Sequence, residues 1–493
     1  MAQEVEMGRR MFIRRRCEMI GRKNEADILR ESTEKSQAQL IVVYGRRRVG
    51  KTFLVRETFP DGFFFQHTGI LDVPMAEQLA AFRDSLIEAG AKDVPDLADW
   101  REAFNELKRL VKEGGKGKKV MFIDEMPWMD TPKSRFIQWF EAFWNGWASA
   151  RKDIVLIVCG SAASWLVKKV FRNRGGLYNR VSEQIHIRPF TLHECREYCR
   201  VEGLSLSDID IAELYMAFGG IPYYWSMLKK GESVAQNLDR LLFSRNGKLR
   251  NEFRDVFGSL FGESVAYETI VRALASVKSG MPRDALLSSC GMVKGGNATR
   301  YLDDLEACGF IRKFTAFGKR KRDALYQLMD NFTLFHMKFL DGESNPDEHF
   351  WQHSANQPSV NVWRGLAFER ICLQHVAQIK EAIGVGGVLT HVFAWRHAPD
   401  SDCPEGAQID LLIERADRVV NVCEIKFTRK PYLITREYNE RLRRKVAVFA
   451  SVTKTRLAPH LTMITTYGIS RSGYLGAFHS EVTLEDLFVD VRR

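Results

Sequence analysis

Two glycines, a lysine and a threonine stand at fixed spacing between an apolar run and a helical pattern near the start of the chain. The apolar run is Leu40–Tyr44, the helical pattern is Phe53–Thr58, and between them lies Gly45-Arg46-Arg47-Arg48-Val49-Gly50-Lys51-Thr52. Glycines permit backbone angles that turn successive N–H groups into a concave anion site, and the following helix adds its positive dipole end. This order of strand, GxxxxGKT segment and helix predicts a phosphate-binding loop.

The same motif predicts roles for individual side chains. Lys51 is expected to place its cation beside the β and γ phosphates of a nucleotide, and the Thr52 hydroxyl is expected to bind Mg²⁺. A flexible glycine turn is the alternative, but it would not require the flanking strand and helix. The residues predicted to bind the nucleotide here are Gly45, Arg46, Arg47, Arg48, Val49, Gly50, Lys51, Thr52 and Phe53.

Two carboxylates follow a second apolar run. Val120–Ile123 reads as a buried strand and is followed directly by Asp124 and Glu125. Ligands of open α/β sheets bind beside the carboxyl ends of the parallel strands, so this end should lie near the phosphate-binding loop. Asp124 is then expected to hold the magnesium shell, and Glu125 to orient or deprotonate the attacking water. Together the two motifs predict an ATPase that uses ATP and Mg²⁺.

Apolar runs alternate with helical patterns over residues 18–190, which follow a basic tail at residues 1–17. Buried strands of a parallel sheet have such unbroken apolar runs, so this region is predicted to be an α/β P-loop NTPase core with helices on both faces of the sheet. Residues 191–260 are expected to form a helical lid, beginning at a capping-box pattern over Thr191–Glu194. The predicted strands are Leu40–Tyr44, Phe63–Gln66, Val120–Ile123, Ile154–Cys159 and Gln184–Ile187.

Residues 261–342 have the pattern of a winged helix-turn-helix: three short helices followed by two strands around a basic turn. Asn297 is the predicted N-cap of the third helix and Gly309 its predicted stop. The predicted elements are helices Tyr267–Val277, Arg283–Ser289 and Ala298–Cys308, and strands Phe310–Phe314 and Leu325–Leu328.

Two interpretations of this module remain open. In a DNA-binding module the third helix would enter a major groove and the basic turn would contact phosphates. Candidate base contacts are Asn297, Thr299 and Arg300, and candidate phosphate contacts are Lys319, Arg320, Lys321 and Arg322. In a packing module the helix would serve the interior of the protein, which would agree with the acidic residues Asp303, Asp304 and Glu306 on the same helix.

A polar segment at residues 343–358 is predicted to be a linker, and residues 359–493 a further α/β domain. Its helix Val362–Ala382 carries Glu369, its strand Gln408–Ile413 carries Asp410, and its strand Val419–Phe427 carries Glu424 and Lys426. Side chains two positions apart on a strand share a face, so Glu424 and Lys426 should point the same way. With Asp410 they are expected to bind Mg²⁺ and a scissile phosphate. Charged residues on a solvated strand face are the alternative.

Several segments resemble one family. Met19-Ile20-Gly21-Arg22 with Glu25, the phosphate-binding loop and Ile123-Asp124-Glu125 resemble AAA+/STAND ATPases, and in particular the archaeal-type ATPases that carry a C-terminal restriction-endonuclease-like domain. The C-terminal acids are similar to the PD-(D/E)xK nuclease core, with Glu369 as its helical acid, Asp410 as its central acid, and Glu424 and Lys426 as its ExK pair. The chain departs from that core at Ile409, where a proline is usual.

The resemblance implies further nucleotide contacts. Ile20, Gly21 and Arg22 would form the adenine-side box, and Ser161 would sense the γ-phosphate. Arg180, in Leu177-Tyr178-Asn179-Arg180, would face the nucleotide and support catalysis. Pro222, in Gly220-Ile221-Pro222, would belong to the GxP segment of a STAND lid. Such relatives often complete their sites between subunits, which leaves a homo-oligomer open.

The composition of the chain limits the kinds of partner and the cellular location that we expect for it. The formal net charge of +11 is compatible with DNA or another nucleic acid, and equally with a merely basic protein. No apolar stretch suits a signal peptide or a membrane span, and the nine scattered cysteines suit a reducing compartment, so a cytoplasmic protein is expected. The predicted function is an ATP-hydrolysing switch whose nuclease-like domain acts on or binds nucleic acid. The alternatives are a non-cleaving ATP-dependent regulator and, less in keeping with the motifs, a small-molecule phosphotransferase.

Overall fold

The computed structural model describes residues 19–161, 163–171, 177, 179–262, 264–320, 323–341, 347–401, 403–471 and 478–491. The basic tail at residues 1–17 lies outside the described residues. The chain divides into two compact units, with the boundary between Arg188 and Pro189. No helix among the described residues is both long enough and apolar enough to cross a membrane.

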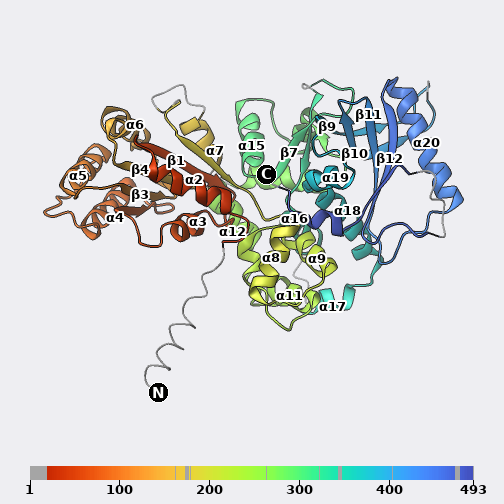
Figure 1. The fold of residues 1–493 in the computed structure, drawn as a ribbon, viewed down its shortest axis with the longest axis horizontal. Coiled ribbons are helices and arrows are strands. Elements are labelled where there is room, and N and C mark those ends of the chain that lie inside the picture. The colour runs from red at the N-terminus through yellow and green to blue at the C-terminus, as the bar shows by residue number, and fades with distance from the viewer. Residues whose placement is uncertain are drawn as a thin grey trace, which may run out of the picture. The chain divides into compact units, whose positions relative to one another are not determined.

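The described residues of the first unit form a sheet of five parallel strands in the order β2-β3-β4-β1-β5 (Figure 1). The predicted α/β fold with a parallel sheet is therefore confirmed, and so are its five strands. Their bounds are β1 (Gln39–Gly45), β2 (Phe65–Thr68), β3 (Lys119–Asp124), β4 (Ile154–Gly160) and β5 (Glu183–Ile187).

Both faces of this sheet are buried, which explains why its strands are apolar at successive positions. Leu40 and Val42 pack into a cluster with the aromatic residues of α4 (Met75–Glu88), α5 (Trp100–Glu113) and α6 (Phe136–Gly146). The intervening residues Ile41 and Val43 point to the other face and are just as buried. Helices α2 (Lys23–Glu34) and α3 (Lys51–Thr58) also contact β1. Short helices complete the unit: η1 (Met126–Met129), η2 (Ala148–Ala150), α7 (Ala163–Leu166) and the π-helical turn η3 (Val167–Phe171).

A buried histidine makes the first unit sensitive to acid. His67 on β2 is 2% exposed, its Nδ1 lies 2.9 Å from the Ser85 hydroxyl, and its ring contacts Phe82. Burial lowers the pKa of His67 to about 4. In the unfolded chain this histidine therefore binds a proton near pH 6.5, whereas in the folded unit it binds one only near pH 4.

The stability associated with this histidine should be present above pH 6.5 and fall by about 1.4 kcal/mol for each pH unit between there and pH 4. We expect His67→Leu to remove most of this loss, since leucine cannot be protonated. Urea unfolding of both proteins at pH 7.5 and pH 5 measures the effect. Equal pH dependence in the two proteins would contradict it.

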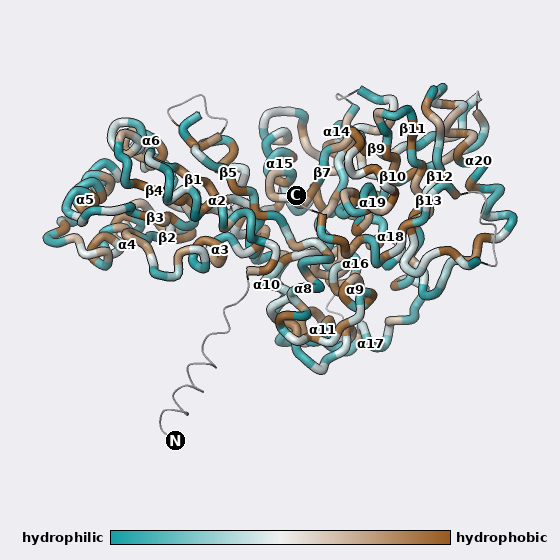
Figure 2. The backbone as a smooth tube through the Cα atoms, viewed as in Figure 1, coloured by the Kyte–Doolittle hydropathy of each residue, from teal (hydrophilic) through white to brown (hydrophobic). Residues whose placement is uncertain are grey.

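The second unit begins with helices, as predicted. They are α8 (Leu192–Glu202), α9 (Asp208–Phe218), α10 (Pro222–Trp225), α11 (Val234–Leu238), the π-helical turn η4 (Asp239–Phe243) and α12 (Glu252–Phe261). The predicted capping box is present, with Thr191 and Glu194 exchanging side-chain and backbone hydrogen bonds. Figure 2 shows hydrophobic segments where α9 packs against α11 and α16 (Asn331–Phe339).

The next segment has the elements expected of a winged helix-turn-helix. Helices α13 (Val265–Ala275), α14 (Arg283–Ser289) and α15 (Gly296–Ala307) are followed by strands β7 (Ile311–Phe314) and β8 (Leu325–Leu328). A short strand that the sequence did not suggest, β6 (Met281–Pro282), joins them in the order β6-β8-β7. Gly309 follows α15 with φ 76°, in agreement with its predicted role as a stop. The N-cap prediction was wrong: α15 begins one residue before Asn297, with Gly295 at the cap.

The segment expected to be a linker contains a helix. Within residues 343–358, α17 (Phe350–Ser354) buries Trp351 against Phe335, Phe339 and Trp363. The Asp239 carboxylate accepts hydrogen bonds from the backbone N–H groups of Trp351 and Gln352, at 2.7 and 3.2 Å. Because the residues around Trp351 are mostly polar, the sequence did not predict that this side chain is buried. Residues 342–346 lie outside the described residues.

A mixed five-stranded sheet in the order β13-β12-β11-β10-β9 forms the last part of the chain. Its strands are β9 (Thr390–His397), β10 (Ala407–Arg415), β11 (Val419–Lys426), β12 (Ala458–Thr465) and β13 (Ser480–Val482), with α20 (Arg436–Thr453) and η6 (Glu485–Phe488). The helix expected over Val362–Ala382 is two helices, α18 (Pro358–Gln374) and α19 (Val376–Ala382). His375 separates them with non-helical backbone angles of φ −115° and ψ 32°, and its ring bonds to Ile371 O and to the Leu192 N–H.

Candidate nucleotide site and acidic cluster

The phosphate-binding loop joins β1 to α3 and has the backbone that its glycines predict. Gly45, Arg48 and Gly50 have φ values of 154°, 69° and 90°. A Cβ atom on Gly45 would lie 2.2 Å from the Ile187 carbonyl oxygen, so the loop passes β5 too closely for any other residue. Helix α3 begins at Lys51, and its first N–H groups therefore face the loop.

Lys51 is folded onto its own loop. Its ammonium donates hydrogen bonds to the carbonyl oxygens of Gly45 and Arg46, at 3.2 and 3.0 Å, and the residue is 5% exposed. A buried ammonium needs acceptors, and the loop carbonyls supply them. The oxygens of a bound phosphate would offer the same cation a charged acceptor, which forms a stronger hydrogen bond than a carbonyl.

Thr52 and Asp124, the two residues predicted to bind Mg²⁺, are in direct contact. The Thr52 hydroxyl donates a 2.7 Å hydrogen bond to the Asp124 carboxylate, although the residues are 72 positions apart. The other Asp124 oxygen accepts from the Glu125 N–H at 2.9 Å, and Asp124 is 4% exposed. A hydroxyl and a carboxylate are hard oxygen ligands that suit Mg²⁺, which keeps waters and phosphates as its remaining ligands. The described residues contain no group of three acidic, histidine or cysteine side chains that would enclose a metal alone.

Glu125 is held in place by Ser161 at the end of β4. One carboxylate oxygen of Glu125 accepts hydrogen bonds from the Ser161 N–H and hydroxyl, at 3.0 and 2.8 Å. Glu125 itself has φ 46°, a strained value for a residue with a side chain. The two strand ends therefore fix the direction of the carboxylate that was predicted to act on water.

We expect Ser161→Ala to lower the rate of ATP hydrolysis about tenfold, in the range typical of residues that orient a catalytic group. Nucleotide affinity should change little, because Ser161 acts through Glu125. Phosphate release under saturating ATP measures the rate. Ser32→Ala is a matched control, since the Ser32 hydroxyl is also buried and donates only to a backbone carbonyl of its own helix. Equal rates for the two variants would contradict the orienting role.

The other residues predicted to contact the nucleotide lie just before α2, within the loop, at the start of α3 and in a turn at Arg180. Ile20 and Gly21 precede α2, and the buried Arg22 donates to the Arg188 carbonyl at 2.6 Å. Arg180 is exposed in a turn after Leu177, and Tyr178 lies outside the described residues. Among the other loop residues, Arg46 and Val49 are buried, and Phe53 is 46% exposed on the first turn of α3. The roles of all these residues remain predictions.

Gly220-Ile221-Pro222 lies in the second unit and has a structural reason for its sequence. A Cβ atom on Gly220 would lie 1.9 Å from the Phe190 carbonyl oxygen, and Pro222 begins α10. The Trp225 indole donates to the Gly219 carbonyl at 2.8 Å. The segment is thus a packed helix start, and a role of Pro222 toward the nucleotide remains a prediction.

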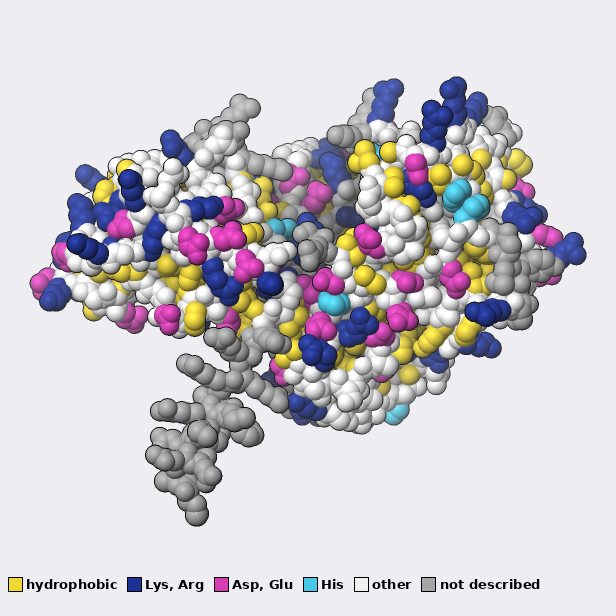
Figure 3. Space-filling view, in the orientation of Figure 1, with side chains coloured by type: hydrophobic (Ala, Val, Ile, Leu, Met, Phe, Trp, Pro, Cys, Tyr) yellow, Lys and Arg dark blue, Asp and Glu magenta, His cyan; other side chains and the backbone are white. Residues whose placement is uncertain are grey.

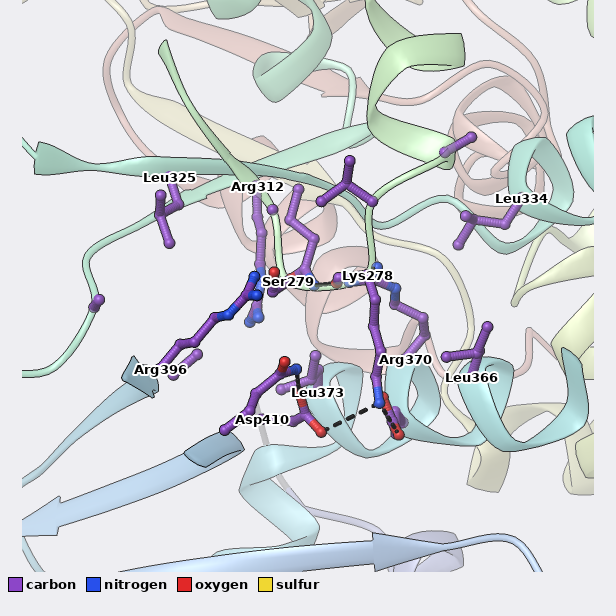
Figure 4. Close-up of a pocket in the computed structure, with 18 of the residues that line it drawn as sticks. Lys278, Ser279, Arg312, Leu325, Leu334, Leu366, Arg370, Leu373, Arg396 and Asp410 are labelled. Atoms are coloured by element: carbon purple, nitrogen blue, oxygen red, sulfur yellow. Dashed lines mark hydrogen bonds and ion pairs between the residues drawn. The ribbon is translucent and has the colours of Figure 1, made fainter. Parts of the chain in front are cut away.

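The contacts of the four predicted nuclease-like residues fall into two groups, each around different lysines. Glu369 on α18 and Asp410 on β10 share one cation, the Lys278 ammonium, at 2.7 and 3.5 Å (Figure 4). Glu424 on β11 instead contacts Lys426 at 3.2 Å, and its other partners are Lys445 at 2.6 Å and the Tyr438 hydroxyl at 2.9 Å. Asp410 and Glu424 lie next to the paired residues Leu411 and Cys423 of the neighbouring strands β10 and β11, and each acid contacts its own lysines. Their convergence on a metal stays a prediction.

The two groups differ in protonation. Burial, and next the charge of Asp410, raise the pKa of Glu369 to about 7. Although burial opposes it, the charges of Lys445 and Lys426 lower the pKa of Glu424. The charge of Asp410 raises the pKa of Lys278 against the effect of burial. At neutral pH the Lys278 group therefore carries little net negative charge to attract a divalent cation.

Sequence reasoning missed Lys278, which follows α13 of the winged-helix segment. It missed as well that the β7–β8 turn packs on the C-terminal sheet: the Phe317 N–H donates to the Ala394 carbonyl, and its ring contacts Phe393 and Phe449. Asp304 of α15 is buried and accepts a 2.8 Å hydrogen bond from the Tyr267 hydroxyl, which agrees with a packing role for this acid. The wing therefore packs on the C-terminal sheet through Phe317, whereas Lys319 and Arg320 in the wing and Asn297, Thr299 and Arg300 of α15 are exposed. Contact of these exposed residues with DNA stays a prediction. Lys321 and Arg322 lie outside the described residues.

Comparison with known proteins shows which families and sequences this chain resembles. Residues 19–228 match the model of a family described as an ATPase domain predominantly from Archaea. An uncharacterised protein of Methanocaldococcus jannaschii is 23% identical over 412 residues, which cover 83% of this chain and 87% of the relative. An uncharacterised ATP-binding protein of the same organism is 45% identical over 38 residues, or 8% of this chain and 64% of that protein.

Two solved structures resemble part of the chain. The Walker-type ATPase of Pyrococcus abyssi is 19% identical with a TM-score of 0.49, and the match covers 65% of this chain and 96% of that one. The ORC2 protein of Aeropyrum pernix, solved as ADPNP and ADP complexes, is 12% identical with a TM-score of 0.39, covering 65% and 93%. The family match includes the phosphate-binding loop, Asp124, Glu125 and Ser161.

Proposed function

We propose that the first unit operates as an ATP-driven switch for a nucleic-acid-binding second unit, because residues 19–228 match the model of an ATPase domain family that is predominantly from Archaea. The observation that carries the proposal is the contact of Thr52 with Asp124, since it joins the helix after the loop to the strand that ends in the catalytic acids. ATP binding is inferred from the same contact and from the position of Lys51.

In the proposed reaction, Lys51 exchanges its loop carbonyls for the β and γ phosphates. Thr52 and Asp124 would hold Mg²⁺, which when bound neutralises charge on the phosphates. Glu125, oriented by Ser161, positions the attacking water and accepts its proton. Ile20, Gly21 and Arg22 would border the adenine, and Arg180 would approach the phosphates. Pro222 would belong to a lid of the STAND type, which would transmit the state of the nucleotide.

The nucleic-acid role is supported by exposed cations on α20. Arg436, Arg441, Arg443 and Arg444 are exposed on this helix, close in sequence to Lys445, which contacts Glu424. Figure 3 shows Lys and Arg side chains at the end of the second unit that carries α20. Exposed arginines bind phosphates without regard to sequence and lose affinity with salt. A DNA or RNA backbone is the partner that this surface suits.

Binding of a labelled single- or double-stranded oligonucleotide, followed by fluorescence anisotropy with and without ATP, tests this role. We expect Arg443→Gln/Arg444→Gln to weaken binding about tenfold and to reduce the salt dependence by about two phosphate contacts. Lys112→Gln/Lys116→Gln, two exposed lysines of the first unit, is the matched control. If both double variants bind like the unmodified chain, α20 is not the interface.

Cleavage is a second candidate function, favoured by one observation: Glu369 and Asp410 converge on a single cation. That cation is Lys278, so the arrangement supports binding without cleavage unless Lys278 is displaced. Magnesium-dependent nicking of plasmid DNA by the unmodified chain and by Lys278→Met separates the two functions. Nicking that is greater in Lys278→Met and is abolished by adding Asp410→Ala would support a nuclease. No nicking by either protein would leave the non-cleaving regulator.

A further inference from the structure

A cavity of about 1120 Å³ lies within the second unit, between the winged-helix segment and the C-terminal sheet. Its walls come from the loop after α13, strands β7, β9 and β10, and helices α16 and α18. Three arginines from three of these elements line it: Arg312 on β7, Arg370 on α18 and Arg396 on β9. In Figure 4 the side chains of Arg312 and Arg396 extend toward each other across the cavity.

Two of these arginines are only partly compensated: the charge of Asp410 acts on both, and that of Glu369 acts on Arg370. Arg312 donates to the Gln327 amide oxygen at 2.8 Å and stacks on Phe314. Arg370 is 7% exposed and donates to the Lys278 carbonyl at 3.1 Å. Within the part of the chain that the structure describes, neither guanidinium makes an ion pair with a carboxylate, because Lys278 takes both Glu369 and Asp410.

Such an arrangement is costly without a counter-ion. A buried cation loses its hydration, and neutral hydrogen-bond partners restore only part of that free energy. In agreement with this cost, burial, and next the charge of Arg370, lower the pKa of Arg312 to about 9, and burial lowers the pKa of Arg370 to about 10. Both remain protonated at neutral pH, and the cavity lining has seven Lys and Arg residues against four Asp and Glu residues, so the cavity keeps positive charge that an anion would stabilise.

The rest of the lining limits the size and kind of anion. Leu325, Leu334, Leu366 and Leu373 form apolar walls around the arginines. Arginine binds phosphate through paired hydrogen bonds, and apolar walls suit the organic part of the same molecule. Because Arg370 is almost fully buried, the phosphates of a DNA or RNA duplex could not reach it, whereas a small molecule with a terminal phosphate could.

We propose that this cavity binds a nucleoside monophosphate, with its phosphate on Arg312, Arg370 and Arg396 and its base and sugar against the leucine walls. The site is separate from the phosphate-binding loop of the first unit. A loop of that type holds the β and γ phosphates, which a monophosphate lacks. Ligand binding here would neutralise the arginines and hold together the winged-helix segment and the C-terminal sheet.

Calorimetric titration of the full chain with AMP, GMP, CMP and UMP tests the proposal, with adenosine as the probe that lacks a phosphate. We expect saturable binding of at least one monophosphate at one per chain, and none of adenosine. Arg396→Gln changes an exposed side chain and should weaken this binding at least about tenfold, as should Arg312→Lys, which keeps the charge but loses the paired hydrogen bonds.

Two matched variants make the result specific. Arg254→Gln removes an exposed arginine from α12, outside the cavity, and should bind as the unmodified chain does. Lys51→Ala should also leave monophosphate binding unchanged, so failure of the ATP site and failure of this cavity are distinguished. The proposal is overturned if no monophosphate binds, if Arg396→Gln and Arg312→Lys both bind normally, or if a 5′-phosphorylated tetranucleotide binds tenfold tighter than every monophosphate. The last outcome would assign the cavity to a strand end.

Discussion

Lys51→Ala is expected to reduce ATP hydrolysis by about 100-fold or more and to weaken ATP binding, because the phosphates lose their buried cation. Lys51 is the loop residue whose ammonium reaches the Gly45 and Arg46 carbonyls, and alanine reaches neither them nor a phosphate. Phosphate release and calorimetric titration with ATP measure the two effects. Lys112→Ala, at an exposed lysine of the same unit, should hydrolyse ATP at the normal rate. Normal hydrolysis by Lys51→Ala would remove the loop from the mechanism.

Glu125→Gln should separate binding from hydrolysis. Glutamine keeps the shape of the side chain and can still contact Ser161, but it cannot accept a proton from water. We expect the hydrolysis rate to fall between about 100-fold and 10,000-fold, the range for removal of a general base, while ATP affinity stays within about threefold. Single-turnover hydrolysis with trapped ATP measures this difference.

The control for that substitution is Glu57→Gln, an exposed glutamate of α3 that makes the same chemical change away from the acids. It should leave both affinity and rate unchanged. A Glu125→Gln variant that hydrolyses ATP as fast as this control would mean that another group activates the water. A variant that also fails to bind ATP would mean that Glu125 supports the fold of the site rather than the chemistry.

The nucleotide site could be anticipated from sequence because its parts are local. Gly45, Gly50 and Lys51 lie in one loop, and the apolar run before Asp124 identifies its strand. Parallel strands bring their carboxyl ends to one edge of a sheet, so Thr52 and Asp124 meet even though 72 residues separate them. The contact of Ser161 with Glu125 follows from the same rule, since β4 lies beside β3.

For the second unit, the sequence predicted the helices and strands but not the tertiary contacts between them. Helices α13 to α15 and strands β7, β8, β10 and β11 agree with their predicted positions to within a few residues. Which groups would neutralise the acids depends on tertiary contacts, and Lys278 is 91 residues from Glu369 along the chain. A lysine after a helix resembles any solvated lysine in sequence. The contacts of Phe317 and Trp351 were missed as well, because the short segments around them carry no periodic pattern.

The packing of these parts has a consequence for regulation. The loop that carries Lys278 also accepts hydrogen bonds from Arg370 and Gln327 through the Lys278 carbonyl, at 3.1 and 2.6 Å. The acids, the cavity arginines and the winged-helix segment are therefore joined at one residue. A ligand that moved this loop would change the charge around Glu369 and Asp410 at the same time.

Binding of a non-hydrolysable ATP analogue to the full chain, followed by calorimetry in Mg²⁺ and again in EDTA, tests the nucleotide site most directly. The geometry of Lys51, Thr52 and Asp124 predicts saturable binding at one analogue per first unit, with higher affinity in Mg²⁺ than in EDTA. Absence of saturable binding in Mg²⁺, or equal affinity in Mg²⁺ and EDTA, would contradict the assignment of these residues to a phosphate and metal site.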